Sequence, residues 1–421
     1  MSSKINSGDM TELGISFFDR SNVKQETIQV GVGVPLGLER VFDSRCGIGG
    51  VYGSWGQSFN NKGLIDLIES WLDESIMEDE KMNLSDLGFV SRHHTPLLNE
   101  SEHLKLEIEV GTHILKEAIE CNGWKPSEIE GVLLGISGPV SDDYVCQISR
   151  QAGIPESALK VSVHKACDGS MGALNLSLNP RLAAPGQVNI AQELLGKKIL
   201  VGGIEGLSRF ISKTRDRNAL QLFGNGAGVI GIIPGESLKF LVGKDFEDYD
   251  EDGVLAVRMF YPHSRERKPG KSMVEISKDN VSGVRVAGLM HEPMDNSPIA
   301  MTGMMGMVKL FVRTGVQVVS DVYNSYQAMM YKLGTPDKSI AVAIAHHANL
   351  KINSLKHKQL QKIGINFSMP WLLSDFGNVC SASNVIAFLR QLPLLKPGDH
   401  ILFDGFGAGT YYDVLAVEMG G

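Results

Sequence analysis

The segment LKVSVHKACDGSMGALNLSLN, residues 159–179, places a cysteine at the junction of two predicted elements and is the strongest indication of the fold. Its first part predicts a strand that ends at Cys167, and the remainder predicts the helix that follows. A helix N-terminus offers unpaired backbone N–H groups and a positive dipole end, which favour the thiolate form of a cysteine. The small residues Ala166, Gly169 and Gly172 would let a substrate approach closely. From this segment alone, a nucleophilic Cys167 and a buried structural cysteine are about equally favoured.

The C-terminal half repeats this arrangement of elements. KSIAVAIAHHANL predicts a buried strand ending in His346 and His347, followed by a helix, an extended piece, a Gly-Asn turn that carries Asn378, and another helix. In the first half, a strand ending near Gly138 leads in the same way through a helix and a strand to the Cys167 turn. The segments ILVGGIEG and ILFDGFGAG each close a half with a hydrophobic strand and a glycine turn. Any α/β protein shows some recurrence, but polar residues on equivalent turns favour a structural duplication.

The turns of the second half carry side chains that suit acyl chemistry. His346 or His347 could act as a general base or donate a hydrogen bond to a carbonyl oxygen, although a core histidine is the more common case. Asn378 could aim its amide N–H at an enolate, or be present because asparagine tolerates a left-handed turn. The FGAG turn, residues 406–409, could direct backbone N–H groups at an oxyanion, or simply form a tight hairpin. Together with Cys167 they make a Cys–His–Asn set.

Composition limits the classes of function. The chain has 421 residues, which predicts two domains or two fused halves, and a formal net charge of −8, which argues against general nucleic-acid binding. The odd number of cysteines, without a CxxC pair, argues against a disulfide framework or a structural zinc site. The polar N-terminus predicts no signal peptide, and no apolar run is long enough for a membrane span. We expect a cytoplasmic protein.

Three parts are expected along the chain: an N-terminal arm over residues 1–27, a first half over 28–212 that carries the cysteine, and a second half over 213–421. Residues 36–60 contain turn residues without a clean period, which predicts a loop or an insertion. FGNGAG, residues 223–228, is superficially similar to a dinucleotide loop. It leads into a strand rather than opening a helix, so a Rossmann site is rejected.

Three segments in order resemble ketoacyl-acyl-carrier-protein synthase III, of the thiolase superfamily. HKACDGSMGAL is similar to its nucleophile segment, AHHANLKI to its histidine segment and FGNVCSAS to its asparagine segment, so His346 and Asn378 align with the catalytic pair. The resemblance covers about residues 110–421 well and implies an α/β thiolase-like fold, with duplicated βαβαβαββ halves in a five-layered αβαβα architecture. The departures are His347 for a glutamine, Asp168 for a small residue, and Val379 and Cys380 for Thr-Ser.

The resemblance also implies a mechanism. Cys167 takes an acyl group from acyl-coenzyme A or an acyl carrier protein, and backbone N–H groups of Cys167 and of Gly407 or Ala408 hold the oxyanion. A malonyl thioester then loses carbon dioxide, and His346 and Asn378 stabilise the enolate that attacks the acyl-cysteine. The implied product is a 3-oxoacyl thioester, with no tightly bound cofactor.

The same resemblance implies contacts to partners. Trp71, Arg92 and Asn349 are the residues expected to bind coenzyme A. A homodimer is implied, in which the core strand and helix of the first half form the interface and the partner shapes the acyl pocket.

Two rival functions stay open at this point. The same fold could transfer the acyl group without decarboxylation, or condense thioesters with a glutamate base as in hydroxymethylglutaryl-coenzyme A synthase. A non-catalytic scaffold subunit is the other rival, against which the intact trio argues. A metal site at His346 and His347 is disfavoured, because adjacent residues of a strand point to opposite faces.

Overall fold

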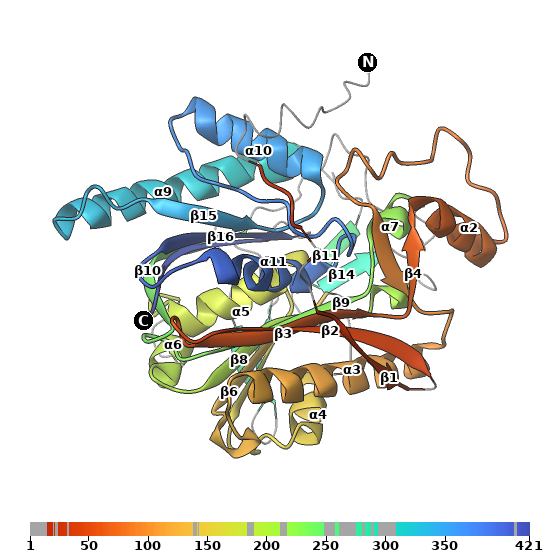
Figure 1. Cartoon of the computed structure of the whole chain (residues 1–421), viewed down its shortest axis with the longest axis horizontal. Helices are drawn as coiled ribbons and strands as arrows, with labels where there is room; N and C mark the ends of the chain where they lie inside the picture. Colours follow the sequence, from red (N-terminus) through yellow and green to blue (C-terminus); the bar gives the residue numbers. More distant parts are fainter. Residues whose placement is uncertain are drawn as a thin grey trace.

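Apolar runs such as GVLLG (131–135) and IAVAIA (340–345) form almost fully buried strands, because helices cover both faces of their sheets. Figure 1 shows the layers that result. The computed structural model describes residues 15–19, 21, 24–31, 33–137, 141, 143–182, 189–210, 217–247, 257–260, 275–279, 283–287, 290–293, 309–407 and 411–421.

The first sheet holds nine strands in the order β1-β2-β3-β9-β8-β6-β7-β13-β12. Its central strands β6, β7 and β8 run parallel, with Leu133 opposite both Val161 and Val201. The bounds are β1 Glu26–Val30, β2 Val34–Asp43, β3 Ile48–Trp55, β9 Gly226–Ile232, β8 Ile199–Glu205, β6 Gly131–Gly135, β7 Leu159–Val163, β13 Gly283–Ala287 and β12 Glu275–Asp279.

The second sheet has the order β10-β17-β16-β15, with bounds Leu238–Glu247, Tyr411–Met419, His400–Gly407 and Ile340–Ala345. A parallel bridge from Val342 to Ser368 adds a short extended piece beyond β15. The core of the first sheet is β3-β9-β8-β6-β7, and the second sheet with its extra piece is β10-β17-β16-β15-Ser368. If the strands of each half are numbered in chain order, the two series follow the same order across the sheet. The sheets therefore repeat one topology, as the duplication predicted.

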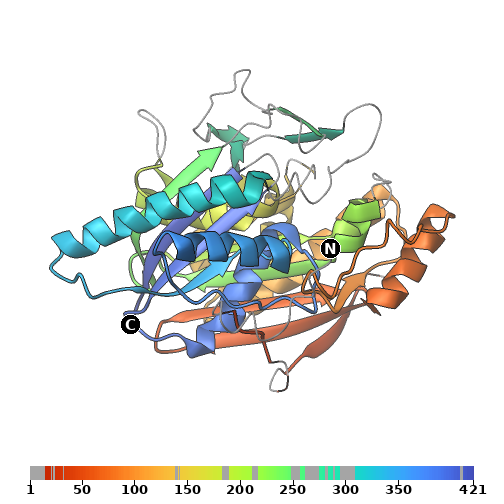
Figure 2. The same ribbon diagram turned by 90° about the horizontal axis from the view of Figure 1, so that it is seen from above.

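Helices form three further layers, so the order through the molecule is αβαβα (Figure 1), and Figure 2 looks down on this stack from the side of the second sheet's outer helices. Helices α5 (Gly169–Leu178) and α11 (Ser383–Gln391) lie between the sheets and contact both. Helices α3 (Glu100–Cys121) and α4 (Tyr144–Gln151) cover the outer face of the first sheet. On the second sheet α9 (Gly315–Lys332) packs on β10 and β17, and α10 (Leu350–Lys362) lies beside it. Every residue of α5 is buried, which explains its small and apolar sequence.

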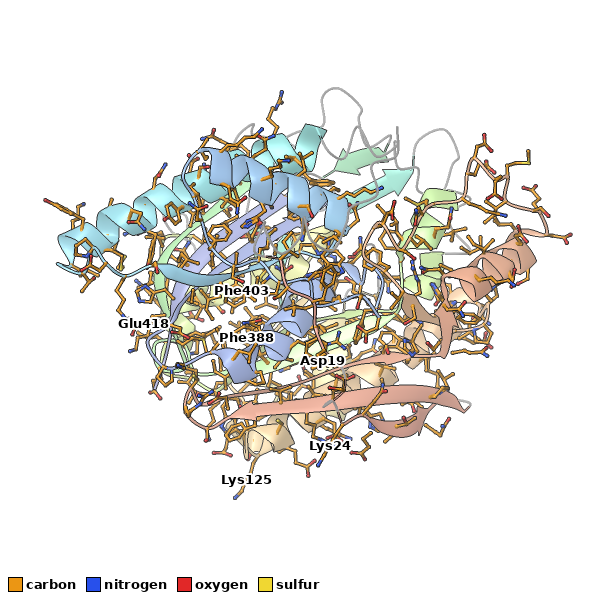
Figure 3. The ribbon with its side chains drawn as sticks, turned by 45° about the horizontal axis from the view of Figure 1, so that its top comes forward. Asp19, Lys24, Lys125, Phe388, Phe403 and Glu418 are labelled. Atoms are coloured by element: carbon orange, nitrogen blue, oxygen red, sulfur yellow. The ribbon has the colours of Figure 1, made fainter. Side chains whose placement is uncertain are left out.

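Apolar side chains fill the space between the layers, whereas charged side chains lie at the periphery (Figure 3). Phe388 of α11 packs on Phe403 of β16, with ring centroids 5.2 Å apart. Shorter elements complete the fold: β4 (Gln57–Asn60), α2 (Asn61–Leu72), β5 (Ser91–His94), α6 (Ile190–Leu194), α7 (Arg217–Leu222), β11 (Val257–Phe260), β14 (Met290–Pro293), a π-helix (Lys309–Thr314) and 3-10 turns at Pro126–Glu128, Ala166–Asp168, Leu207–Phe210, Cys380–Ala382 and Leu392–Leu394.

The prediction of a loop over residues 36–60 is wrong, because this segment contributes β2, β3 and β4. All residues of β3 are buried, so the strand lacks the alternation that would have revealed it. Its glycines serve close packing rather than turns. A Cβ at Gly50 would lie 2.6 Å from the carbonyl oxygen of Val229, and one at Gly53 would lie 2.1 Å from that of Gly37.

The boundaries between the parts also differ from those expected. Strand β9, which ends at Ile232, belongs to the first sheet, so that sheet extends past the predicted boundary at residue 212. Of the predicted N-terminal arm, residues 15–19 lie along Trp371, whose backbone N–H donates to the Ser16 carbonyl oxygen over 2.7 Å. Ile15 is buried there.

The edge of β7 is paired within the chain. Strand β13 runs parallel to it, from Gly283 opposite Lys160 to Val286 opposite Val163. In the expected homodimer, a core strand and helix of the first half form the interface. The edge of β7, a core strand of that half, is already paired with β13. The homodimer stays a prediction. Among the described residues, no helix is both long and apolar enough to cross a bilayer.

Candidate active site

Cys167 lies in a 3-10 turn, Ala166–Asp168, that joins β7 to α5. Ala166 has a left-handed backbone with φ of 48°, which bends the chain sharply before the cysteine. The side chain of Cys167 is half-buried. The junction of strand and helix that the sequence predicted is therefore present, and the thiol lies where it can be reached.

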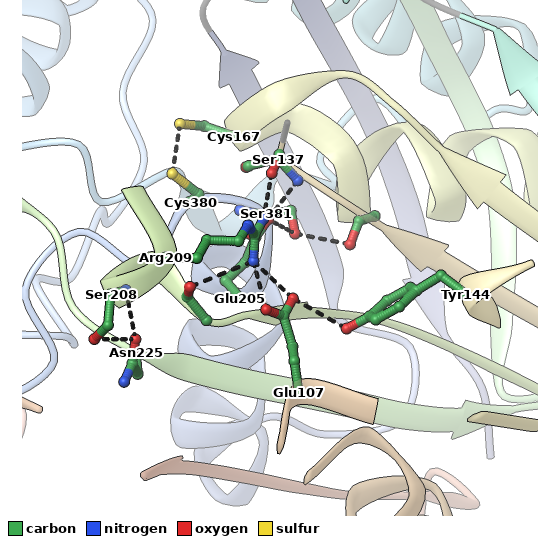
Figure 4. A network of polar contacts seen from close by, with 12 residues as sticks. Glu107, Ser137, Tyr144, Cys167, Glu205, Ser208, Arg209, Asn225, Cys380 and Ser381 are labelled. Carbon is green, nitrogen blue, oxygen red and sulfur yellow. Dashed lines mark hydrogen bonds and ion pairs between the residues drawn. The ribbon is translucent and has the colours of Figure 1, made fainter. Parts of the chain in front are cut away.

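An equivalent turn, Cys380–Ala382, precedes α11 in the second half. Cys380 has φ of 41° and so repeats the left-handed step of Ala166. The two turns pack together, and the Sγ atoms of Cys167 and Cys380 lie 3.3 Å apart (Figure 4). Burial, and to a smaller extent the neighbouring Cys167, raises the pKa of Cys380 well above its ordinary value, so this thiol keeps its proton.

Asn378 is held two residues before that second thiol. Its Oδ1 atom accepts a hydrogen bond of 2.9 Å from the backbone N–H of Cys380. Its own backbone is bonded to residues 222–224: its N–H donates to Leu222, and its carbonyl oxygen accepts from Gly224. With the oxygen engaged, the Nδ2 group is the end of the carboxamide that remains to donate to a ligand.

His346 follows β15 directly and is only 1% exposed. Its backbone N–H donates to the carbonyl oxygen of Asp404 over 2.9 Å, and its carbonyl oxygen accepts from Asn353 Nδ2 over 3.0 Å. The imidazole packs edge-on against the Phe406 ring, 5.0 Å between centroids. Among the described residues, neither ring nitrogen has a hydrogen-bond partner. A buried imidazole in this state has capacity to bond a ligand.

Gly407, the last residue of β16, packs against the backbone of the turn that carries the nucleophile. A Cβ at this position would lie 2.7 Å from the backbone nitrogen of Asp168 and 3.0 Å from that of Cys167. Only glycine allows this approach, which places strand β16 beside the N–H of the nucleophile. Ala408, the alternative oxyanion donor, lies outside the described residues.

The neighbouring His347 has a different environment. Its Nε2 atom accepts a hydrogen bond of 2.9 Å from the backbone N–H of Leu372, and its ring packs 4.5 Å from that of Trp371. Burial, and then the adjacent His346, lowers the pKa of His347 to about 3, so the ring is neutral. Within the described parts of the chain, no group of three His, Cys, Asp or Glu side chains could hold a metal ion.

A buried polar network supports the two turns from below (Figure 4). Glu205 Oε1 lies 2.5 Å from Ser381 Oγ and accepts from the backbone N–H of Ser137 over 2.9 Å, which links the second half to the first. Arg209 pairs with Glu107 at 2.6 Å and lies 3.4 Å from Glu205. Burial raises the pKa of Glu205 to about 7, although Arg209 opposes this shift.

A second buried cluster surrounds Asp168. Lys165 Nζ lies 2.6 Å from Asp413 Oδ2, and Asn175 Nδ2 donates to Asp413 Oδ1 over 2.7 Å. Burial, and then the negative Asp413, raises the pKa of Asp168 well above its usual range. Gly405 makes room for the carboxyl group, because a Cβ there would lie 2.1 Å from Asp168 Oδ1. A neutral acid is thus accommodated where the resembling family has a small residue.

The three residues expected to bind coenzyme A have local partners, and the Arg92 side chain lies against Gly377, the residue before Asn378. Trp71 is half-buried and packs edge-on against His94, 5.3 Å between centroids. Arg92 is fully buried and donates to Asn61 Oδ1 over 3.0 Å and to the carbonyl oxygen of Gln221. Asn349 caps α10, its side chain accepting from the N–H of Ile352 over 2.9 Å. Their roles in coenzyme A binding stay predictions, and the enclosure of Arg92 does not favour its assignment.

Sequence reasoning did not foresee the contact of Cys380 with the nucleophile or the part played by Glu205. Cys380 was visible only as a departure from the resembling motif, two residues after Asn378. Glu205 stood in the segment ILVGGIEG, which was assigned a structural role alone. Glu205 could have been noticed because it is a charged residue at the end of an otherwise apolar, glycine-rich strand.

Comparison with known proteins shows which proteins this chain resembles. The C-terminal part of the chain, residues 330–419, matches the family model described as 3-oxoacyl-[acyl-carrier-protein] synthase III C terminal. That range contains His346, Asn378 and Gly407. The β-ketoacyl-[acyl-carrier-protein] synthase III of Clostridium tetani is 26% identical over 318 residues, which are 74% of this chain and 83% of that protein.

Solved structures share the fold. The 3-oxoacyl-[acyl-carrier-protein] synthase III of Aquifex aeolicus superposes with a TM-score of 0.57 at 17% identity, covering 94% of this chain and all of that one. The 1,3,6,8-tetrahydroxynaphthalene synthase of Streptomyces coelicolor, a type III polyketide synthase, gives a TM-score of 0.56 at 12% identity, over 87% of this chain and 96% of that one. The predicted thiolase-like fold is confirmed.

Proposed function

We propose that this chain, a thiolase-fold protein similar to the ketoacyl-acyl-carrier-protein synthase III enzymes, is a condensing acyltransferase whose nucleophile is Cys167. The observation that carries the proposal is the meeting of three turns. The Asn378–Cys380 turn contacts the Cys167 thiol, and Gly407 packs on the Cys167 backbone. A thiol, a carboxamide donor and a strand end packed beside the backbone N–H of the nucleophile are parts that acyl transfer can use.

In the first step the Cys167 thiolate attacks the carbonyl carbon of an acyl thioester. The carbonyl electrons move to the oxygen, which accepts hydrogen bonds from the N–H of Cys167 and from the turn at Gly407 or Ala408. When the carbonyl re-forms, the carbon–sulfur bond to the carrier breaks. The carrier leaves as a thiol after it takes up a proton, and the acyl group remains on Cys167.

In the second step a malonyl thioester loses carbon dioxide, and the electron pair of the broken carbon–carbon bond forms an enolate. His346 and the Nδ2 group of Asn378 donate hydrogen bonds to the enolate oxygen. The unpartnered, buried ring of His346 and the fixed orientation of Asn378 support these roles. The carbanion attacks the acyl-cysteine, which releases a 3-oxoacyl thioester and regenerates the Cys167 thiolate.

The substrates follow from the chemistry and from the names of the relatives. Those names specify an acyl carrier protein, so we propose that a malonyl group on a carrier protein is the extender and that acyl-coenzyme A is the primer. A thiolate nucleophile and an enolate held by hydrogen bonds need no tightly bound cofactor. A panel of acyl-coenzyme A thioesters would determine which length and branching of the acyl chain the protein accepts.

Intact-mass measurement after incubation with a panel of acyl-coenzyme A thioesters tests the first step. We expect the mass to rise by one acyl group, located on the peptide that contains Cys167, and to stay unchanged in Cys167→Ser. Cys146→Ser is a matched control, because this half-buried cysteine lies on α4 outside the site. A wild-type mass that stayed constant with every chain length would refute the nucleophilic role.

Release of carbon dioxide from a malonyl thioester tests the second step and separates it from its rivals. His346→Ala and Asn378→Ala are expected to abolish release while Cys167 is still acylated. Acylation without carbon dioxide release in the wild type would instead support a non-decarboxylating acyltransferase. No acylation and no release would support a scaffold.

A further inference from the structure

The nucleophile has a second thiol within contact distance. The Sγ atoms of Cys167 and Cys380 lie 3.3 Å apart, and both residues are in the thiol form. A disulfide bond is about 2.05 Å long, so a shift of about 1 Å would join them. Each residue lies in a short 3-10 turn, and the two turns belong to different halves of the fold.

The two thiols differ in access to solvent. Cys167 is half-buried, whereas Cys380 is 2% exposed and packs with Leu207, Cys167 and Phe223 in a small apolar cluster. An oxidant that enters from solvent therefore meets Cys167 first. A reactive thiol with a shielded second cysteine beside it is the arrangement of many redox-sensitive sites.

We propose that peroxide oxidation joins Cys167 and Cys380 in a reversible disulfide, which withdraws the Cys167 sulfur from nucleophilic attack. The bond is a modification of the thiol pair itself and does not depend on which acyl substrate the protein uses. It would also protect Cys167 from irreversible oxidation, because Cys380 reacts with the first oxidised form.

The chemistry balances with a hydroperoxide as the oxidant. The Cys167 thiolate attacks one peroxide oxygen, the O–O bond breaks, hydroxide leaves, and the sulfur is oxidised by two electrons to sulfenic acid. Cys380 then attacks that sulfur, the S–O bond breaks, and the proton of Cys380 leaves with the hydroxyl group as water. A dithiol such as dithiothreitol reverses the bond by thiol–disulfide exchange.

The test treats the reduced full-length protein with hydrogen peroxide and maps its tryptic peptides without reductant. We expect peptide 166–181 to be linked to peptide 363–390, with a mass two hydrogen atoms below the sum of the two reduced peptides. Dithiothreitol should separate the peptides and restore iodoacetamide labelling of Cys167. These readouts need no turnover, so a failure of the proposed condensation would leave them intact.

Cys380→Ser removes the second sulfur at nearly constant size. In this variant we expect no linked peptide, and sulfinic acid on Cys167 that dithiothreitol does not reverse. Cys146→Ser should behave like the wild type. Sulfinic acid on wild-type Cys167 without any linked peptide would overturn the proposal, as would full recovery of the Cys380→Ser variant by reductant. If Cys380→Ser failed to fold, the wild-type peptide map alone would decide.

Discussion

The backbone N–H of Cys380 donates a hydrogen bond of 2.9 Å to the side-chain oxygen of Asn378, and this bond fixes the orientation of the carboxamide and so of its Nδ2 donor. The same cysteine contacts the Cys167 thiol at 3.3 Å. Cys380 therefore both orients the amide donor of Asn378 and contacts Cys167, the nucleophile in the first half.

Asn378→Asp tests the orientation of the carboxamide. Aspartate keeps an oxygen that accepts from Cys380 but lacks the Nδ2 donor, so the enolate loses one hydrogen bond and meets a negative charge. We expect decarboxylation of a malonyl thioester to slow by about 100-fold or more, while acylation of Cys167 persists. Single-turnover acylation and carbon dioxide release measure the two steps separately. Equal loss in both steps would argue against a role confined to the enolate.

Gly407→Ala tests the approach of β16 to the nucleophile. The added Cβ would lie 2.7 Å from the nitrogen of Asp168, so one of the two turns has to shift. We expect acylation of Cys167 to slow by about 100-fold, because displaced backbone donors no longer meet the oxyanion. Gly63→Ala is the matched control, since a Cβ there would make only ordinary contacts from 3.5 Å. Unchanged acylation in Gly407→Ala would contradict the assignment.

His347→Gln and His347→Leu separate a structural acceptor from a catalytic base. Glutamine can accept from the N–H of Leu372, as the imidazole does over 2.9 Å, whereas leucine cannot. We expect His347→Gln to keep most activity, and His347→Leu to lose about 1–3 kcal/mol of unfolding free energy because a buried N–H loses its partner. Urea unfolding and acylation rates measure the two effects. Strong loss of activity in a fully stable His347→Gln would indicate a direct catalytic role.

Glu205 should make stability depend on pH. Burial raises the pKa of Glu205 in the folded protein to about 7, above its ordinary value of 4.5. Between these values the folded state holds more protons than the unfolded state, so its stability falls as pH rises through this window and levels off above it. The loss is of the order of 3 kcal/mol. Urea unfolding at pH 5 and pH 8 should show a smaller decline in Glu205→Gln, and equal declines would refute the shift.

Lys165 and Asp413 should be strongly coupled. Burial alone would lower the pKa of Lys165, but the neighbouring carboxyl groups, Asp413 at 2.6 Å foremost among them, together outweigh burial and raise that pKa above its ordinary value. Lys165→Met leaves a buried carboxylate unpaired, and we expect about 3–5 kcal/mol lower unfolding free energy. Adding Asp413→Asn removes that charge and keeps the oxygen that accepts from Asn175. The double variant should recover part of the loss; purely additive effects would exclude coupling.

Several features were predictable because they depend on local pattern. The strand–turn–helix around Cys167 and the strand that ends just before His346 follow from short apolar runs and their polar ends. Strand β3 was not predictable in this way, because burial of all its residues removes the alternation that marks a strand. The place of β9 in the first sheet could not be predicted, because β9 joins that sheet through partners distant in the sequence.

The sequence by itself determined which residue types stand on the equivalent turns of two halves, and so the thiolase-like fold and the candidates Cys167, His346 and Asn378. Only the tertiary structure decided how those turns meet. It placed Cys380 beside the nucleophile, gave His347 a backbone partner, and buried Glu205 and Asp168 where their pKa values rise. The physical reason is that periodicity and turn chemistry act between near neighbours, whereas contact, burial and electrostatic coupling depend on segments far apart in the sequence, 213 residues in the case of Cys167 and Cys380.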